Sequence, residues 1–270
     1  MEKTQQSMKV KVSHEVPLQL LEDSKMFNDY DYCLPHLLDQ YPEYEEYFRK
    51  AKRTGRYIIM DNSLHELGKA YDTSRLLHWV FELEPNEFIV PDVWENSELS
   101  VRNAKNWSVT ELPKNTTKVA VVQGKSYIDF STSYQRYKWL GYKKIAFSYG
   151  ASWFQETFPH PNPYISKMMG RLKTIANLYK NNIISDFDRV HLLGCNLPQE
   201  YLYYTDFKFI ESIDTSNPVI HGLEGVRYTQ GGLLYKSKQK IDKDFTQEVT
   251  PTQKADIIYN VNMFRKINKL

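Results

Sequence analysis

The chain has 270 residues, of which 41% are hydrophobic and 25% are charged, a composition that excludes a disordered protein and fits one large domain. Its 35 basic and 33 acidic residues leave a formal net charge of +2, which excludes a broadly cationic surface but not a local basic face. Only two cysteines are present, Cys33 and Cys195, so a disulfide framework is not expected.

No apolar run approaches the ~20 residues that a transmembrane helix needs, and the N-terminal residues lack the character of a signal peptide. We therefore expect a cytoplasmic protein without membrane contact, in the host cytoplasm if a phage encodes it. The histidines show neither HxH nor HExxH spacing. The sequence thus predicts no metal site and no cofactor.

Residues 1–30 are expected to form an N-terminal extension, in which Met8–Val12 alternates with lysines as a short strand can. From Asp31 onward, short apolar runs alternate with stretches whose apolar residues recur at helical spacing. The expected strands are Asp31–Leu34, Tyr57–Met60, Phe88–Val90, Lys118–Val122, Lys144–Phe147, Asp188–Leu193 and Phe209–Ile213. An eighth strand is expected within Gly222–Leu234, around Val226 or Leu233.

Helices are expected between these strands. They run from Tyr41 toward Gly55, after Asp72, from Asn96 to Val109, from Ser126 to Leu140, from Tyr164, and from Pro198 to Tyr204. A last helix follows Thr250 and Pro251, where Thr250 and Gln253 have the spacing of a capping box.

The alternation of strands and helices predicts a parallel sheet with right-handed crossovers. About eight such units fit a single-domain (β/α)8 TIM-type barrel over residues 31–270, an α/β fold whose active site forms at the C-terminal strand ends. A doubly wound open sheet is the alternative. It is disfavoured because no Gly-x-Gly-x-x-Gly follows the first strand and no Walker-type loop is present.

Polar residues and glycines recur where the expected strands end. They are Asp61, Asp92, Gln123, Gly150, Gly194 and Asp214. A single aspartate in a turn-rich segment, as at Asp214, is more often a turn or cap residue. Several carboxylates at the catalytic rim of a barrel instead suit glycosyl chemistry, in which one attacks the anomeric carbon and another moves a proton.

The order of these strand ends resembles the tRNA-guanine transglycosylase family, over residues 57–220. The similar segments are Asp61-Asn62-Ser63, the strand end at Asp92, Val122-Gln123-Gly124, Leu140-Gly141-Tyr142 continuing through Ala146 to Gly150, His191-Leu-Leu-Gly194 with Leu197-Pro-Gln-Glu200, and Ile213-Asp214 with Pro218. The resemblance implies a (β/α)8 barrel that exchanges a guanine base in a nucleic acid for a 7-deazaguanine, such as 7-cyano-7-deazaguanine.

The resemblance also implies roles for individual residues. Asp214 would be the nucleophile on C1′ of the target nucleotide, forming a covalent Asp–sugar intermediate, and Asp61 the general acid/base for the departing and incoming bases. Asp92 would hold the N1 and exocyclic-amine edge of the base and Gln123 its O6 side, where the backbone N–H of Gly150 would help.

Ser63, His65 and Gly194 complete the expected substrate-binding set. Ser63-Leu64-His65 replaces the Gly-Gly-Phe that follows the first aspartate in the family, so His65 is expected to stack on the base or to line the pocket. His191 lies inside an apolar strand and is interpreted as a core or supporting residue rather than a metal ligand.

The chain departs from the family in two further places. Members that act on tRNA usually carry a structural zinc held by three cysteines and a histidine near the C-terminus, and this chain has no cysteine beyond Cys195, so no zinc subdomain is expected. Pro218-Val219-Ile220 stands where the family has Pro-Thr-Arg. In both respects the chain resembles the zinc-free phage and bacterial enzymes that insert 7-deazaguanines into DNA.

The expected partners are therefore DNA and a free 7-deazaguanine base, and a homodimer is left open. The lysines at 236, 238, 240 and 243 are a solvated face in the simplest interpretation and phosphate contacts if DNA is the substrate. Three alternatives stay open: an enzyme that acts on tRNA, a non-catalytic partner subunit of the same family, and a glycoside hydrolase. The second is disfavoured because Asp61, Asp92 and Asp214 are all present.

Overall fold

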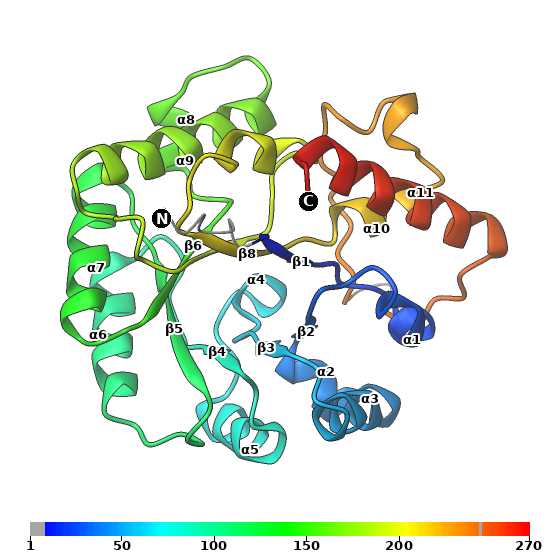
Figure 1. Cartoon of the computed structure of the whole chain (residues 1–270), viewed down its shortest axis with the longest axis horizontal. Helices are drawn as coiled ribbons and strands as arrows, with labels where there is room; N and C mark the ends of the chain where they lie inside the picture. The colour runs from blue at the N-terminus through cyan, green and yellow to red at the C-terminus, as the bar shows by residue number, and fades with distance from the viewer. Residues whose placement is uncertain (1–8, 243–244) are drawn as a thin grey trace, which may run out of the picture.

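The computed structural model describes residues 9–242 and 245–270 and forms a (β/α)8 barrel (Figure 1), so the predicted fold class is confirmed. Its eight strands form one sheet in the order β1-β8-β7-β6-β5-β4-β3-β2, and each pairing between neighbours in this order is parallel. They are β1 (Lys11–Ser13), β2 (Asp31–Cys33), β3 (Ile58–Met60), β4 (Glu87–Ile89), β5 (Thr117–Val122), β6 (Lys144–Ser148), β7 (Val190–Leu193) and β8 (Ile210–Asp214).

The predicted position of the eighth strand is wrong. Residues 222–234 contain the end of α10 (Asn217–Leu223) and the 3-10 helix η3 (Tyr228–Gln230). The strand is instead β1, whose Lys11 is in register with Ser212 of β8. The barrel therefore begins inside the segment expected as an N-terminal extension, and Met8 lies outside the described residues.

Contacts just outside the strands bring β1 and β2 together at the seam of the barrel. The backbone N–H of Asp29 donates to the carbonyl of Val12 over 2.9 Å, and the Asp29 carboxylate accepts from the N–H of Val12 over 2.9 Å. The Tyr30 hydroxyl donates to the carbonyl of Ile213 over 2.8 Å. The two bonds of Val12 satisfy backbone groups that an open sheet edge would leave unpaired, and the Tyr30 bond links the segment before β2 to β8.

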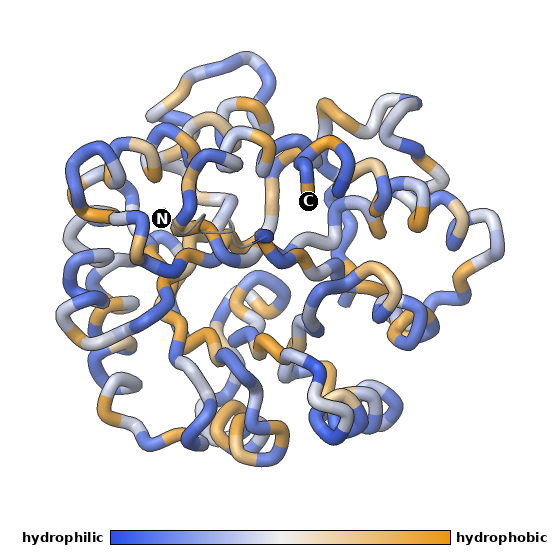
Figure 2. The backbone as a smooth tube through the Cα atoms, in the orientation of Figure 1, coloured by the Kyte–Doolittle hydropathy of each residue, from blue (hydrophilic) through white to orange (hydrophobic). Residues whose placement is uncertain are grey.

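The helices surround the strands (Figure 1). They are α1 (Leu21–Ser24), α2 (Pro35–Gln40), α3 (Pro42–Arg53), α4 (Leu64–Leu67), α5 (Thr73–Leu83), α6 (Ser97–Ser108), α7 (Tyr127–Trp139), α8 (Trp153–Thr157), α9 (Pro163–Lys180), α10 and α11 (Pro251–Asn268), with 3-10 helices η1 (Leu18–Leu20), η2 (Glu200–Tyr204) and η3. The predicted capping box at Thr250 is confirmed. Figure 2 shows hydrophobic residues along inner strands such as β5, as expected for parallel strands covered on both faces.

A buried arginine ties α9 to the loop that follows β7. Arg171 is fully buried and its Nε donates to Glu200 over 2.7 Å. Its other nitrogens donate to the carbonyls of Leu193 over 3.0 Å and Gly194 over 2.9 Å. This one side chain therefore fixes the backbone at a strand end that faces the candidate site.

Arg171→Met is expected to lower the free energy of unfolding by roughly 3–5 kcal/mol, because it leaves the Glu200 carboxylate buried without its cation. Denaturant unfolding would measure the change. Lys173→Met, an exposed position on the same helix, is the control and should change stability by less than about 0.5 kcal/mol. A loss below about 1 kcal/mol for Arg171→Met would show that Arg171 does not stabilise this strand end.

Candidate active site

A pocket opens at the C-terminal ends of the strands, the face of a (β/α)8 barrel that carries ligand sites. Five predicted site residues line it from five different strand ends: Asp61, Asp92, Gln123, Gly194 and Asp214. His65, in α4, lines it as well. The structure therefore brings together residues that are up to about 150 positions apart, because parallel strands end at one face of the barrel.

Two predicted site residues lie behind the pocket wall. Ser63 is fully buried with a φ of 61°, and its hydroxyl is 2.8 Å from Nδ1 of His36. Its backbone N–H donates to the Asp61 carboxylate over 3.0 Å. Gly150 lies against Trp94, which does line the pocket; a Cβ at position 150 would come within 2.6 Å of that indole ring. Ser63 thus supports Asp61, and Gly150 makes room for Trp94.

Asp61 follows β3 and is 8% exposed. Its pKa is raised to about 7, first by burial and then by the negative charges of Asp214 and Asp92. The backbone N–H groups of Asn62 and Ser63 act in the opposite direction. A carboxyl group with a pKa near neutrality can both donate and accept a proton at physiological pH, which is what general acid–base catalysis requires.

Three further carboxyl groups line the pocket and are absent from the predicted site: Glu15, Glu66 and Asp242. The pKa of Glu66 is raised to about 8, first by withdrawal from water and then by the charge of Asp61. The pKa of Glu15 is raised by burial and by the charges of Glu66, Asp214 and Asp61. Because the raised pKa of Glu66 keeps that group largely protonated near neutral pH, the pocket is less negative than its composition suggests.

Asp92 is clamped between two side-chain amides. Its Oδ1 accepts from Nδ2 of Asn62 and its Oδ2 accepts from Nε2 of Gln123, each over 2.7 Å. The carbonyl oxygen of Gln123 in turn accepts from the N–H of Glu95 over 2.9 Å. Burial raises the pKa of Asp92 to about 6 against the effect of both amides. The clamp fixes the carboxylate plane and leaves lone pairs for a ligand, since a carboxylate has about four acceptor sites.

Asp214 ends β8 and is 5% exposed. Its Oδ1 lies 2.9 Å from Nε2 of His191, and its Oδ2 accepts from the backbone N–H of Gly194 over 3.3 Å. Gly194 has a φ of 60°, and a Cβ there would come within 2.4 Å of the Tyr149 ring. A side chain at position 194 would therefore displace either Tyr149 or the N–H that faces Asp214.

Aromatic side chains form another part of the pocket wall. The Tyr149 hydroxyl is 3.2 Å from Nε2 of His65, and the two ring centroids are 5.6 Å apart. The ammonium group of Lys236 lies 3.5 Å from the centroid of the Tyr149 ring, in the geometry of a cation–π contact. Together with Trp94, these rings offer flat apolar surface beside the carboxyl groups.

Residues 236–242, which we call the lysine segment, also contribute to the pocket. Lys236 donates to the carbonyl of Cys195 over 2.7 Å, and Lys240 donates to the carbonyl of His65 over 2.7 Å. Both lysines line the pocket. Lys238 is exposed, and Lys243 lies outside the described residues.

Both cysteines are buried and unpaired. None of the helices in residues 9–242 and 245–270 has the length and apolar character needed to cross a membrane.

No protein-family model matches the sequence, and a search of curated proteins finds no match. The choice of a function therefore depends on the chemistry of the pocket and on the order of its strand-end residues.

Proposed function

We propose that the protein is a base-exchange transglycosylase that replaces guanine in DNA with a 7-deazaguanine. One observation carries the proposal: a single pocket holds two aspartates in unlike environments. Asp214 contacts the His191 imidazole and the backbone N–H of Gly194, whereas Asp61 accepts from the backbone N–H of Ser63 and its pKa is raised to about 7, first by burial. Two carboxyl groups whose environments differ in this way can act as nucleophile and as proton carrier.

The proposed reaction proceeds in two displacements. In the first, Asp214 attacks C1′, the bond from C1′ to the base breaks, and the departing guanine takes a proton from Asp61. In the second, the incoming base gives a proton to Asp61 and attacks C1′, which releases the Asp214 carboxylate. Two inversions at C1′ retain its configuration, and Asp61 ends the cycle in its starting protonation state.

Base recognition is assigned to the clamped Asp92 and to Gln123. The free lone pairs of Asp92 suit the adjacent N1–H and exocyclic amine of a guanine-like edge. Nε2 of Gln123 uses one hydrogen for Asp92, and its second hydrogen can be donated to O6. A 7-deazaguanine presents the same edge, which allows one site to hold both the departing and the incoming base.

The target nucleotide must leave its stack before a carboxylate inside this pocket can reach its C1′. The aromatic wall of Trp94 and Tyr149 is suited to receive an unstacked base. The lysine segment at the pocket provides cations for the adjacent phosphates. DNA is favoured over tRNA by the departures from the tRNA-acting members in the sequence after Cys195.

The test offers duplex DNA, single-stranded DNA and unmodified tRNA, each with 7-cyano-7-deazaguanine, followed by mass spectrometry of the nucleosides. The expected result is the modified nucleoside in DNA. Incorporation into tRNA alone would overturn the choice of polymer and leave the mechanism standing. No incorporation into any of the three would overturn the proposed function.

A further inference from the structure

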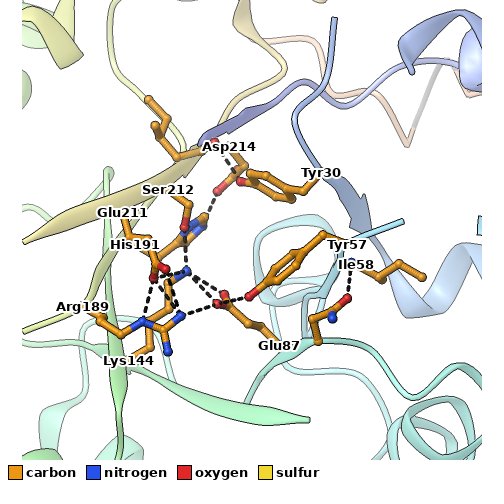
Figure 3. Close-up of polar contacts among 12 residues, drawn as sticks. Tyr30, Tyr57, Ile58, Glu87, Lys144, Arg189, His191, Glu211, Ser212 and Asp214 are labelled. Atoms are coloured by element: carbon orange, nitrogen blue, oxygen red, sulfur yellow. Dashed lines mark hydrogen bonds and ion pairs between the residues drawn. The ribbon is translucent and has the colours of Figure 1, made fainter. Parts of the chain in front are cut away.

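His191 connects Asp214 to a chain of buried polar groups inside the barrel (Figure 3). Nζ of Lys144 donates to Oγ of Ser212 over 2.7 Å, that hydroxyl is 2.8 Å from Nδ1 of His191, and Nε2 of His191 is 2.9 Å from Oδ1 of Asp214. All four residues are buried. The chain is therefore a fixed feature of the interior, not a set of mobile surface contacts.

The donors and acceptors of these four side chains determine which atom donates in each of their hydrogen bonds. A carboxylate only accepts, so the proton on His191 must be at Nε2, facing Asp214. Nδ1 of a neutral imidazole then needs a donor, which the Ser212 hydroxyl supplies. Ser212 is free to give its one proton to His191 because Lys144, which can only donate, satisfies the serine oxygen as an acceptor. Every bond of the chain thus points toward Asp214.

Strand geometry explains how these residues meet. Ser212 and Asp214 are two positions apart on β8 and so face the barrel interior together. His191 is in register with Ser212 on the neighbouring β7, and Lys144 is the first residue of β6. The ring of Tyr32 lies nearly parallel to the His191 imidazole, at an interplanar angle of 11° and a centroid distance of 6.3 Å.

The charges at the start of the chain balance one another. Lys144 contacts Glu87 over 2.7 Å and Glu211 over 3.2 Å, and Arg189 contacts the same two carboxylates over 3.2 Å and 2.9 Å. Figure 3 shows this group around Lys144, with the Tyr57 hydroxyl also directed at Glu87. These two cations and two anions have no formal net charge. The buried polar groups therefore act on Asp214 through oriented hydrogen bonds rather than through excess charge.

We infer that His191 is a positioning residue that selects the attacking oxygen of Asp214, an inference that rests on the proposed function. Its N–H binds Oδ1, whereas Oδ2 has only the longer bond to Gly194 and is left to attack C1′. In the second displacement the same N–H stabilises the charge that returns to the departing carboxylate. Ser212 acts one step further back, by fixing the tautomer of His191.

Three variants test the inference: His191→Leu removes the donor, His191→Gln keeps a side-chain N–H of similar reach, and Ser212→Ala removes the donor to Nδ1. The measurement is the rate at which wild type and variants form the covalent protein–DNA adduct without incoming base. His191→Leu should slow this step about 10²-fold, the loss found for one preorganised donor, with an unchanged Kd for DNA. His191→Gln should form the adduct about tenfold faster than His191→Leu does. Ser212→Ala should form it about tenfold more slowly than wild type.

His160→Leu is the control, because this exposed histidine lies outside the pocket and should leave the rate unchanged. Full-rate adduct formation by His191→Leu would overturn the positioning role while leaving the transglycosylase intact. Equal slowing of the Leu and Gln variants, with equal loss of stability on unfolding, would show a purely structural histidine and also overturn it. A wild-type protein that forms no adduct and incorporates no base would instead overturn the proposed function itself.

Discussion

Asp214→Ala is expected to abolish base exchange, with a loss on the order of 10³-fold or more. Asp61, Glu66 and Asp92 are not suited to substitute for it. Burial raises the pKa of Asp61 to about 7 and that of Glu66 to about 8, so both hold a proton much of the time near neutral pH, and both oxygens of Asp92 accept hydrogen bonds from amides. Exchange of a labelled base and the covalent band on a denaturing gel would both be lost.

Asp206→Ala is the matched control, because this exposed aspartate lies just before β8 and should leave the rate of exchange unchanged. The Asp214→Ala protein should still fold. The substitution removes a negative charge whose repulsion raises the pKa of Asp61, and it leaves the barrel strands intact. A folded Asp214→Ala protein that exchanges bases at a near-normal rate would remove Asp214 from the mechanism.

Most of the barrel could be predicted because strands such as β5 and β6 are continuous apolar runs between helical patterns. A short strand could be expected near Val12, but its role as the eighth strand of the barrel could not, for a physical reason. β1 has three residues, only Val12 among them is apolar, and its place in the sheet depends on pairing with β8. A strand that is specified by a partner about 200 residues away leaves little periodic signal of its own.

The residues at strand ends could be predicted for the same reason as the barrel: once parallel strands are assumed, their ends must share a face. The paths of the longer loops could not, although the lysines of the lysine segment could be named as possible phosphate contacts. Tyr149 and the lysine segment reach the pocket through connections whose path no periodicity encodes.

The chain of polar groups behind Asp214 could not be predicted from the sequence either. A lysine that opens a strand is usually solvated, yet Lys144 is 1% exposed and pairs with Glu87, 57 residues away. His191 could be recognised as a supporting residue, but its contact with Asp214 depends on the relative register of β7 and β8.

Asp61→Asn is expected to stall exchange and yet to stabilise the folded protein at high pH. The pKa of Asp61 is about 7 in the folded state, against about 3.9 in an unfolded chain. The folded protein therefore keeps a proton that the unfolded chain releases, and its stability falls as the pH rises between these two values. Above pH 7 this cost approaches roughly 4 kcal/mol, because each unit of pKa difference corresponds to about 1.4 kcal/mol. Asparagine does not ionise and can still accept from the N–H of Ser63, so it avoids that cost.

Denaturant unfolding should show the variant and wild type nearly equal at pH 4 and the variant more stable at pH 8, whereas Asp206→Asn should show no such trend. If Asp61→Asn were no more stable than wild type at pH 8, Asp61 would not carry the raised pKa that its role as proton carrier requires.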